Sequence, residues 1–82
     1  MYLFLQINED GEVLESIPAK SQDEAFGLLV DSVEHFKEQL EGEVKKEPFY
    51  AWSSTGEMNV SIEYTEDEST WNMYWRILAI GE

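Results

Sequence analysis

No motif in this sequence positions a side chain for covalent or acid–base chemistry. His35 is the only histidine, cysteine is absent, and no serine stands in the pattern of a nucleophile elbow. A Ser-His-Asp triad therefore has no sequence support. An acid and base pair could be chosen freely among 18 acidic residues, so no single pair carries information. We predict that the protein is not an enzyme.

Motifs for metals and phosphates are missing as well. The acidic run Glu66-Asp67-Glu68 has neither the alternating ligands nor the central glycine of an EF-hand loop. The five glycines are scattered singly, so none belongs to a glycine-rich phosphate loop. Gly27 falls inside a helical pattern and is expected to mark a close approach of the helix to the sheet or to a partner. No cofactor and no metal are predicted.

The composition indicates binding through charge. The 82 residues include five basic and 18 acidic side chains, for a net charge of −13. Such a polyanion is repelled by nucleic-acid phosphates and anionic membranes, and is steered toward basic protein surfaces. The apolar start, Met1 to Ile7, matches neither a signal peptide nor a membrane span. We expect a cytoplasmic protein whose partner is a basic protein, without direct binding to nucleic acid or membrane.

The first 20 residues predict a β-hairpin. Residues 2–8 are rich in aromatic and branched side chains, and residues 12–17 form a second short run. Asp10-Gly11 between them suits a tight turn. Pro18 is expected to end the second strand and to mark a sheet edge, because proline has no N–H to donate.

A helix is predicted over residues 22–41. Ser21 followed by Glu24 is a capping-box signature, and Gly42 is placed to stop the helix. Apolar residues then recur at helical spacing, at Phe26, Leu29, Val33, Phe36 and Leu40.

The remaining chain predicts three strands after a polar link at residues 43–47. They cover residues 49–52, 58–64 and 71–80, and the last two are joined by an acidic turn. The element order is ββαβββ. We predict one α+β domain over residues 1–82, with an antiparallel sheet of about five strands and one amphipathic helix packed on one face.

The segment Glu15-Ser16-Ile17 stands directly before a proline and a capped, acidic helix. It resembles the uracil-DNA glycosylase inhibitors encoded by phages. In that family a Glu-Ser-Ile strand edge, followed by a helix with acidic residues at its start, enters the DNA groove of the glycosylase. The small size, the acidity, the lack of cysteine and the α+β layout are also similar. Family members open with a helix where this chain has a hairpin.

The resemblance implies that Glu15 takes the place of a DNA phosphate, while Ser16 and Ile17 align the strand edge beside it. It also implies an apolar pocket between helix and sheet that encloses a side chain of the target. Helical and strand faces assign that pocket to Phe26, Val30, Val33, Met58, Val60 and Trp75, although these residues could equally form the core. Further carboxylates expected at the partner surface are Asp23, Glu24, Glu63, Glu66, Asp67 and Glu68.

The favoured function is inhibition of a uracil-DNA glycosylase by DNA mimicry, by a monomer that forms a 1:1 complex in the cytoplasm of an infected bacterial cell. One alternative is an acidic DNA mimic directed at another host defence protein, such as a restriction, CRISPR or nucleoid protein. Another is a small interaction module that uses the exposed hairpin edge to extend a partner's sheet. Steep weakening of binding by salt favours mimicry over strand addition.

Overall fold

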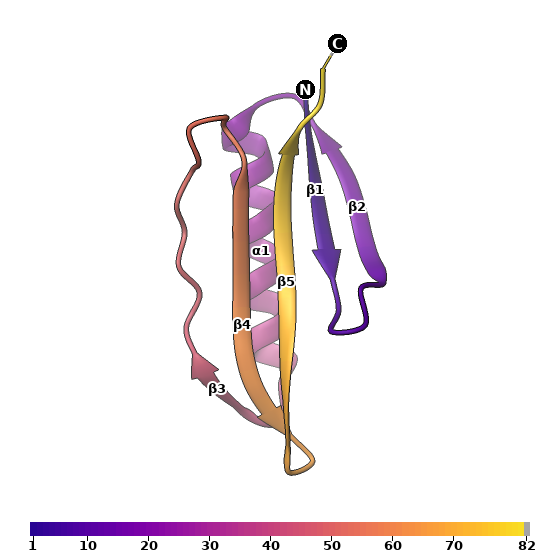
Figure 1. Ribbon diagram of the computed structural model, residues 1–82, viewed down its shortest axis with the longest axis vertical. Coiled ribbons are helices and arrows are strands. Elements are labelled where there is room, and N and C mark those ends of the chain that lie inside the picture. Colours follow the sequence, from indigo (N-terminus) through magenta and orange to yellow (C-terminus); the bar gives the residue numbers. More distant parts are fainter. Residues whose placement is uncertain (82) are drawn as a thin grey trace.

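The hairpin predicted at the start of the chain is present in the computed structural model, which describes residues 1–81. It consists of β1 (Tyr2–Ile7) and β2 (Val13–Ala19) (Figure 1). Gly11 has a φ of 87°, a conformation that glycine adopts without steric penalty. Pro18 does not end the second strand as expected, because it pairs with Leu3 inside β2. It is tolerated there since β2 is an edge strand, where a missing N–H can face solvent.

The predicted helix is also present, as α1 (Gln22–Gln39). The Ser21 hydroxyl accepts a hydrogen bond from the Glu24 amide at 3.1 Å, which satisfies one of the free N–H groups of the first turn. The helix ends two residues earlier than predicted, because Leu40 is already extended. At Gly42 an added Cβ would lie 1.6 Å from the carbonyl oxygen of Thr65, so only glycine fits. The close approach to the sheet expected at Gly27 is wrong, since nothing in this chain lies within 4 Å of a Cβ there.

The third strand differs from the prediction. No strand forms at residues 49–52, whereas the presumed polar link contains β3 (Glu43–Lys46). Two aromatic residues of the segment 49–52 pack on the helix instead: the ring of Tyr50 lies edge-on to Phe26 at 5.8 Å, and the ring of Trp52 lies 6.1 Å from Phe26. Ring burial against α1 thus replaces strand pairing in this segment.

The last two strands are confirmed as β4 (Met58–Glu66) and β5 (Ser69–Ala79). They are joined by a two-residue turn in which Asp67 and Glu68 have φ values of 53° and 66°. Two successive residues with positive φ are typical of the tight turns that match the twist of a hairpin.

The five strands form one antiparallel sheet in the order β2-β1-β5-β4-β3. Strand β1 therefore lies between β2 and β5, and the Met1 carbonyl accepts a hydrogen bond from the Ile80 amide at 2.9 Å. The helix covers one face of the sheet, and the other face carries no described element (Figure 1). This arrangement confirms the predicted α+β fold with element order ββαβββ.

The core lies between α1 and the sheet. Its largest fully buried side chains are Trp75, Phe4, Leu29, Ile62, Ile77 and Val33. The buried indole N–H of Trp75 donates to Ser32 Oγ at 2.9 Å, and Ser32 Oγ donates in turn to Gln6 Oε1 at 3.2 Å. A short polar chain thus ties the helix to β5 and β1, since a buried donor without a partner would cost about 1–3 kcal/mol.

Candidate protein-binding edge

Glu15, Ser16 and Ile17 lie in the middle of β2, the edge strand of the sheet. Ile17 pairs with the fully buried Phe4, and it packs against the core from the helix side. Because side chains alternate along a strand, Glu15 also points to the helix side, whereas Ser16 points to the open face. Glu15 and Ser16 are exposed. Ile17 thus fixes the strand, and Glu15 presents its carboxylate beside the helix.

A hollow of about 270 Å³ adjoins Glu15 between β2 and α1. Its other lining residues are Gln6, Leu28, Asp31, Ser32 and His35. Within residues 1–81, no hydrogen bond or ion pair holds the Glu15 carboxylate, so it is available to a partner's donor. His35 is exposed, as its place on the helical pattern indicates.

Sequence reasoning missed three helix residues of this hollow, Leu28, Asp31 and His35. Their spacing of three and four residues places them on one helical stripe. That stripe runs next to the buried one that contains Ala25, Leu29 and Val33. The sequence therefore shows that the three residues share one side of the helix. It does not show that β2 lies beside that side, which is what makes them a wall of the hollow.

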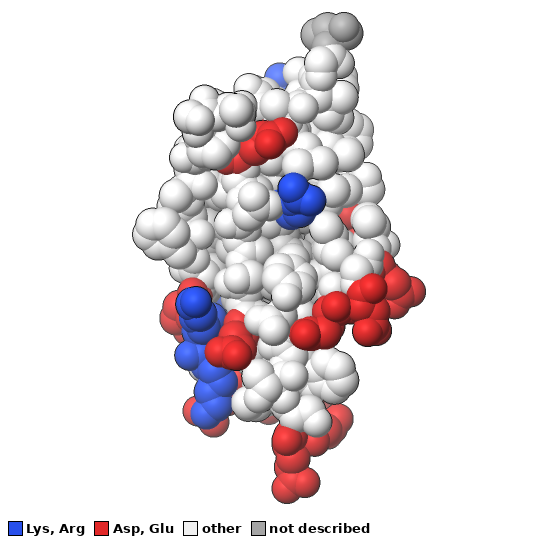
Figure 2. Space-filling model, in the orientation of Figure 1, with Lys and Arg blue, Asp and Glu red and all other residues white. Residues whose placement is uncertain are grey.

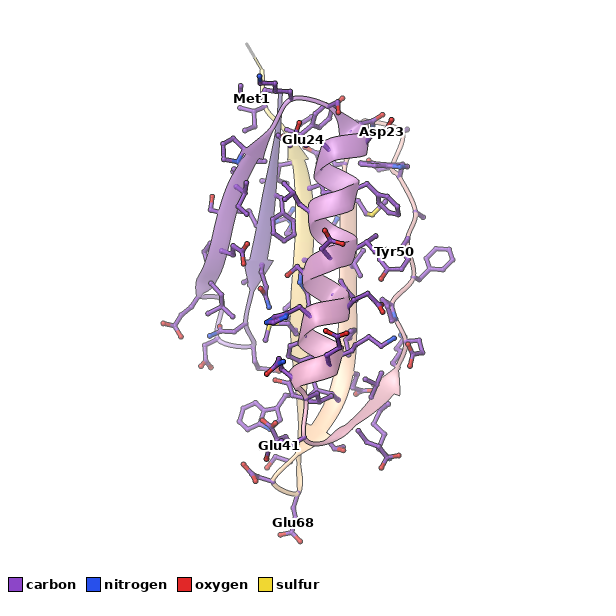
Figure 3. The ribbon with its side chains drawn as sticks, turned by 180° about the vertical axis from the view of Figure 1, so that it is seen from behind. Met1, Asp23, Glu24, Glu41, Tyr50 and Glu68 are labelled. Atoms are coloured by element: carbon purple, nitrogen blue, oxygen red, sulfur yellow. The ribbon has the colours of Figure 1, made fainter. Side chains whose placement is uncertain are left out.

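The remaining predicted carboxylates do not gather around Glu15. Asp23 and Glu24 lie at one end of the molecule, in the first turn of α1, and Glu68 lies at the opposite end (Figure 3). Glu66 is the last residue of β4, Asp67 and Glu68 form the turn that follows it, and the molecule is 44 Å long. Glu63 alternates with the buried Ile62 and so faces the open side of β4. The predicted carboxylates therefore do not form one compact surface that a single partner face would cover.

Some carboxylates have a structural role. Glu9 accepts a hydrogen bond from the Asn72 amide of β5, which lies beyond the last residue that β1 pairs. Glu57 Oε2 accepts from the Ala79 amide at 2.9 Å. Part of the negative charge therefore lies on carboxylates that also satisfy backbone donors of β5.

The six residues assigned to an apolar pocket form the core. Val33, Met58, Val60 and Trp75 are at most 3% exposed, and Phe26 and Val30 are partly buried against them. Of the two alternatives that the sequence left open, a pocket or the core, the structure shows the core. The buried side of the helix and the helix-facing side of β4 and β5 turn these side chains toward each other. The hollow beside Glu15 contains none of the six.

Comparisons with protein-family models, curated proteins and solved structures found no match. Among residues 1–81, no helix is both long and apolar enough to cross a membrane. The same residues contain no cluster of three or more side chains suited to hold a metal ion. The fold and the edge define the class: a small, acidic α+β protein with a free, carboxylate-bearing β edge.

Proposed function

We propose that this protein inhibits a DNA-binding enzyme, uracil-DNA glycosylase, by occupying its DNA groove with the β2 edge. One observation carries the proposal: Glu15-Ser16-Ile17, the segment that resembles the phage inhibitors, lies on a free edge strand with Glu15 exposed. The net charge of −13 supports it, because such a charge speeds the encounter with a basic groove.

In the proposed complex, Glu15 replaces a DNA phosphate and accepts hydrogen bonds from the phosphate-binding loops of the enzyme. Ile17, packed against the core, holds the strand in place, so binding does not have to order the backbone that carries the carboxylate. No bond is made or broken in the enzyme, and inhibition follows from exclusion of DNA. The proposal needs no apolar pocket, and the hollow beside Glu15 has Leu28 as its only apolar wall.

As such an inhibitor, the protein would act as a monomer in a 1:1 complex in the cytoplasm of an infected bacterial cell. An acidic mimic of this shape could instead be directed at a restriction, CRISPR or nucleoid protein. The same free edge also supports a second candidate, an interaction module in which a partner strand pairs with β2.

The test is uracil excision by a bacterial uracil-DNA glycosylase on a labelled oligonucleotide, titrated with this protein at physiological salt. We expect cleavage to stop near equimolar protein. Undiminished cleavage at large excess would reject this target. Binding that weakens steeply with salt would favour mimicry, because pairing of strand backbones is screened much less.

A matched pair of variants tests the site. Glu15→Ala and Glu43→Ala each remove one exposed carboxylate from an edge strand, but from opposite edges of the sheet. We expect Glu15→Ala to weaken inhibition by about 30-fold or more, since it removes a desolvated, hydrogen-bonded charge. Glu43→Ala should change it by less than about twofold, as is typical of an exposed charge outside an interface. Equal losses would contradict the assignment of Glu15.

A further inference from the structure

The face of the sheet opposite the helix carries an apolar stripe, which consists of Leu3, Leu5 and Ile7 on β1 with Tyr74 and Leu78 on β5. These residues alternate with Phe4, Trp75 and Ile77, which are buried on the helix side. Figure 2 views this face and shows a largely uncharged area over β1 and β5, with acidic groups around it and one basic side chain within it. Arg76 lies between Tyr74 and Leu78 on β5, opposite Leu5. The stripe remains accessible, and Tyr74 is 38% exposed.

The stripe breaks the pattern of a sheet with one solvated face. In such a sheet the outer positions are polar. Strand β4 follows that rule, with Asn59, Ser61 and Glu63 on the open side. Strand β1 instead carries Leu3, Leu5 and Ile7 on the open side in addition to Phe4 on the helix side, a composition typical of strands covered on both faces. The apolar positions are therefore confined to the half of the sheet next to the β2 edge.

A hollow of about 310 Å³ adjoins the stripe where β1, β5 and β4 lie side by side. Ile7, Tyr74, Ser61 and Arg76 are among its lining residues. Arg76 is held in place, because its Nε donates to Asn59 Oδ1 at 2.7 Å. The surface thus offers an apolar strip and a recess large enough for a side chain.

Carboxylates are fixed at both ends of the stripe on β5. Glu9 is bound to the Asn72 amide and Glu57 to the Ala79 amide, so they bracket the segment that holds Tyr74 and Leu78. An apolar strip bordered by carboxylates complements an apolar ridge flanked by Lys or Arg. A second copy would bring the same carboxylates together and add a like charge of −13, which disfavours self-association.

We infer that the basic protein bound at the β2 edge also covers the apolar stripe, so that it grips the edge from both sides. One wall of its groove contacts Glu15 on the helix side, and the other contacts Leu5 and Tyr74 on the open face. Leu5 pairs with Ser16, so the stripe begins one strand away from the proposed edge site. The inference rests on the proposed function and adds to it an apolar ridge, flanked by basic residues, on the target.

The test is the dissociation constant of the complex with bacterial uracil-DNA glycosylase for the variants Leu5→Thr and Tyr74→Thr. Threonine keeps strand propensity and adds no charge. The matched control is Phe49→Thr, since Phe49 is 78% exposed and lies outside the stripe. We expect a loss of about tenfold or more for each stripe variant and less than about twofold for the control. The stripe losses should stay constant with salt, whereas the loss from Glu15→Ala should shrink.

The outcomes separate the two proposals. No binding by the unmodified protein would overturn both. Binding that depends on Glu15 but not on Leu5 or Tyr74 would overturn only the covered stripe. Sedimentation of the free protein as a dimer that both threonine variants dissociate would also overturn it, because a second copy would then occupy the stripe. Circular dichroism and the urea midpoint identify a misfolded variant, and the exposed Tyr74 serves if Leu5→Thr does not fold.

Discussion

The two edges of the sheet differ in how they are protected. Strand β3 has four residues, an irregular register between Val44 and Lys46, and two lysines, features that prevent pairing with a further strand. Strand β2 has seven residues, and its one register shift lies near the hairpin turn. Pro18 is the only residue of β2 that lacks a backbone donor. The comparison indicates that one edge is closed to partners and the other is left open.

The charge distribution follows the same division. Three of the five basic residues, Lys37, Lys45 and Lys46, belong to β3 or to the helix end beside it. Lys37 forms an ion pair with Glu47 at 2.9 Å. This pair ties α1 to the chain just before the aromatic segment, residues 49–52. Figure 3 shows that segment passing along the helix, with Tyr50 on it. The β3 edge is thus neutralised and anchored, whereas β2 presents Glu15 without a cation of its own.

The largest expected effect concerns stability. Phe4→Ala removes a fully buried ring from β1, which supports the β2 edge, and should lower the free energy of unfolding by about 3–5 kcal/mol. Val44→Ala, in the partly buried β3, should lower it by only about 1 kcal/mol. Urea unfolding followed by tryptophan fluorescence measures both. Similar losses would show that β3 is as much a part of the core as β1.

A pair of glycine variants should act with opposite signs. Gly42→Ala forces a Cβ into the Thr65 carbonyl, so the entry to β3 must shift, at a cost of about 2 kcal/mol or more. Gly27→Ala lies on an exposed helix position with free space around it and should stabilise the protein by about 0.5–1 kcal/mol. The urea midpoints should move in opposite directions. If Gly42→Ala left the urea midpoint unchanged or raised it, the contact between Gly42 and Thr65 would contribute nothing to stability.

The smallest expected effect is a loss of stability at high pH, caused by Tyr50 and Lys37, which lie on the β3 side of the molecule. Burial raises the pKa of Tyr50 above its ordinary value of 10.0, and the hydrogen bond to Glu47 raises the pKa of Lys37 above 10.5. A raised pKa in the folded state contributes stability that is complete below the unfolded pKa and disappears as pH rises through the folded one. The free energy of unfolding should therefore decline above about pH 10.

Tyr50→Phe tests the origin of that decline, because it removes one titrating hydroxyl and keeps the ring against Phe26. Urea unfolding between about pH 9 and 11 should show a shallower slope for the variant. Part of the slope should remain, since burial also raises the pKa of Tyr64. An unchanged slope would exclude Tyr50 as a contributor.

Local signals predicted most of the fold correctly. The Asp10-Gly11 turn, the Ser21 cap and the alternation along residues 58–64 each act within a few residues, so the sequence contains them directly. Strand β3 could not be found this way, because Glu43–Lys46 has no apolar alternation and becomes a strand only through pairing with β4. The aromatic segment was misassigned for the same reason: its partner, Phe26, lies on the helix.

The edge position of the Glu15 segment also followed from the sequence, since Pro18 favours an edge strand. The helix residues beside Glu15, which are Leu28, Asp31 and His35, could not be predicted from the sequence. Which face of a helix borders a strand depends on how the helix is rotated over the sheet, and a periodic pattern identifies only the buried stripe. The same rotation packs Phe26, Val30 and Val33 of the helix toward Met58, Val60 and Trp75 of the sheet, so the six expected pocket residues belong to the core.

The pairing of β1 with β5 determines when the sheet can form during synthesis. Tyr2 lies opposite Ala79, so the centre of the sheet joins segments made almost at the two extremes of the described chain. Until β5 leaves the ribosome, β1 has only β2 beside it, and Phe4 lacks the Ile77 side chain that covers it later. Such non-local contacts slow folding. The nascent chain must therefore expose its apolar first strand until β5 has been made, and its dense negative charge can keep it from associating in that interval.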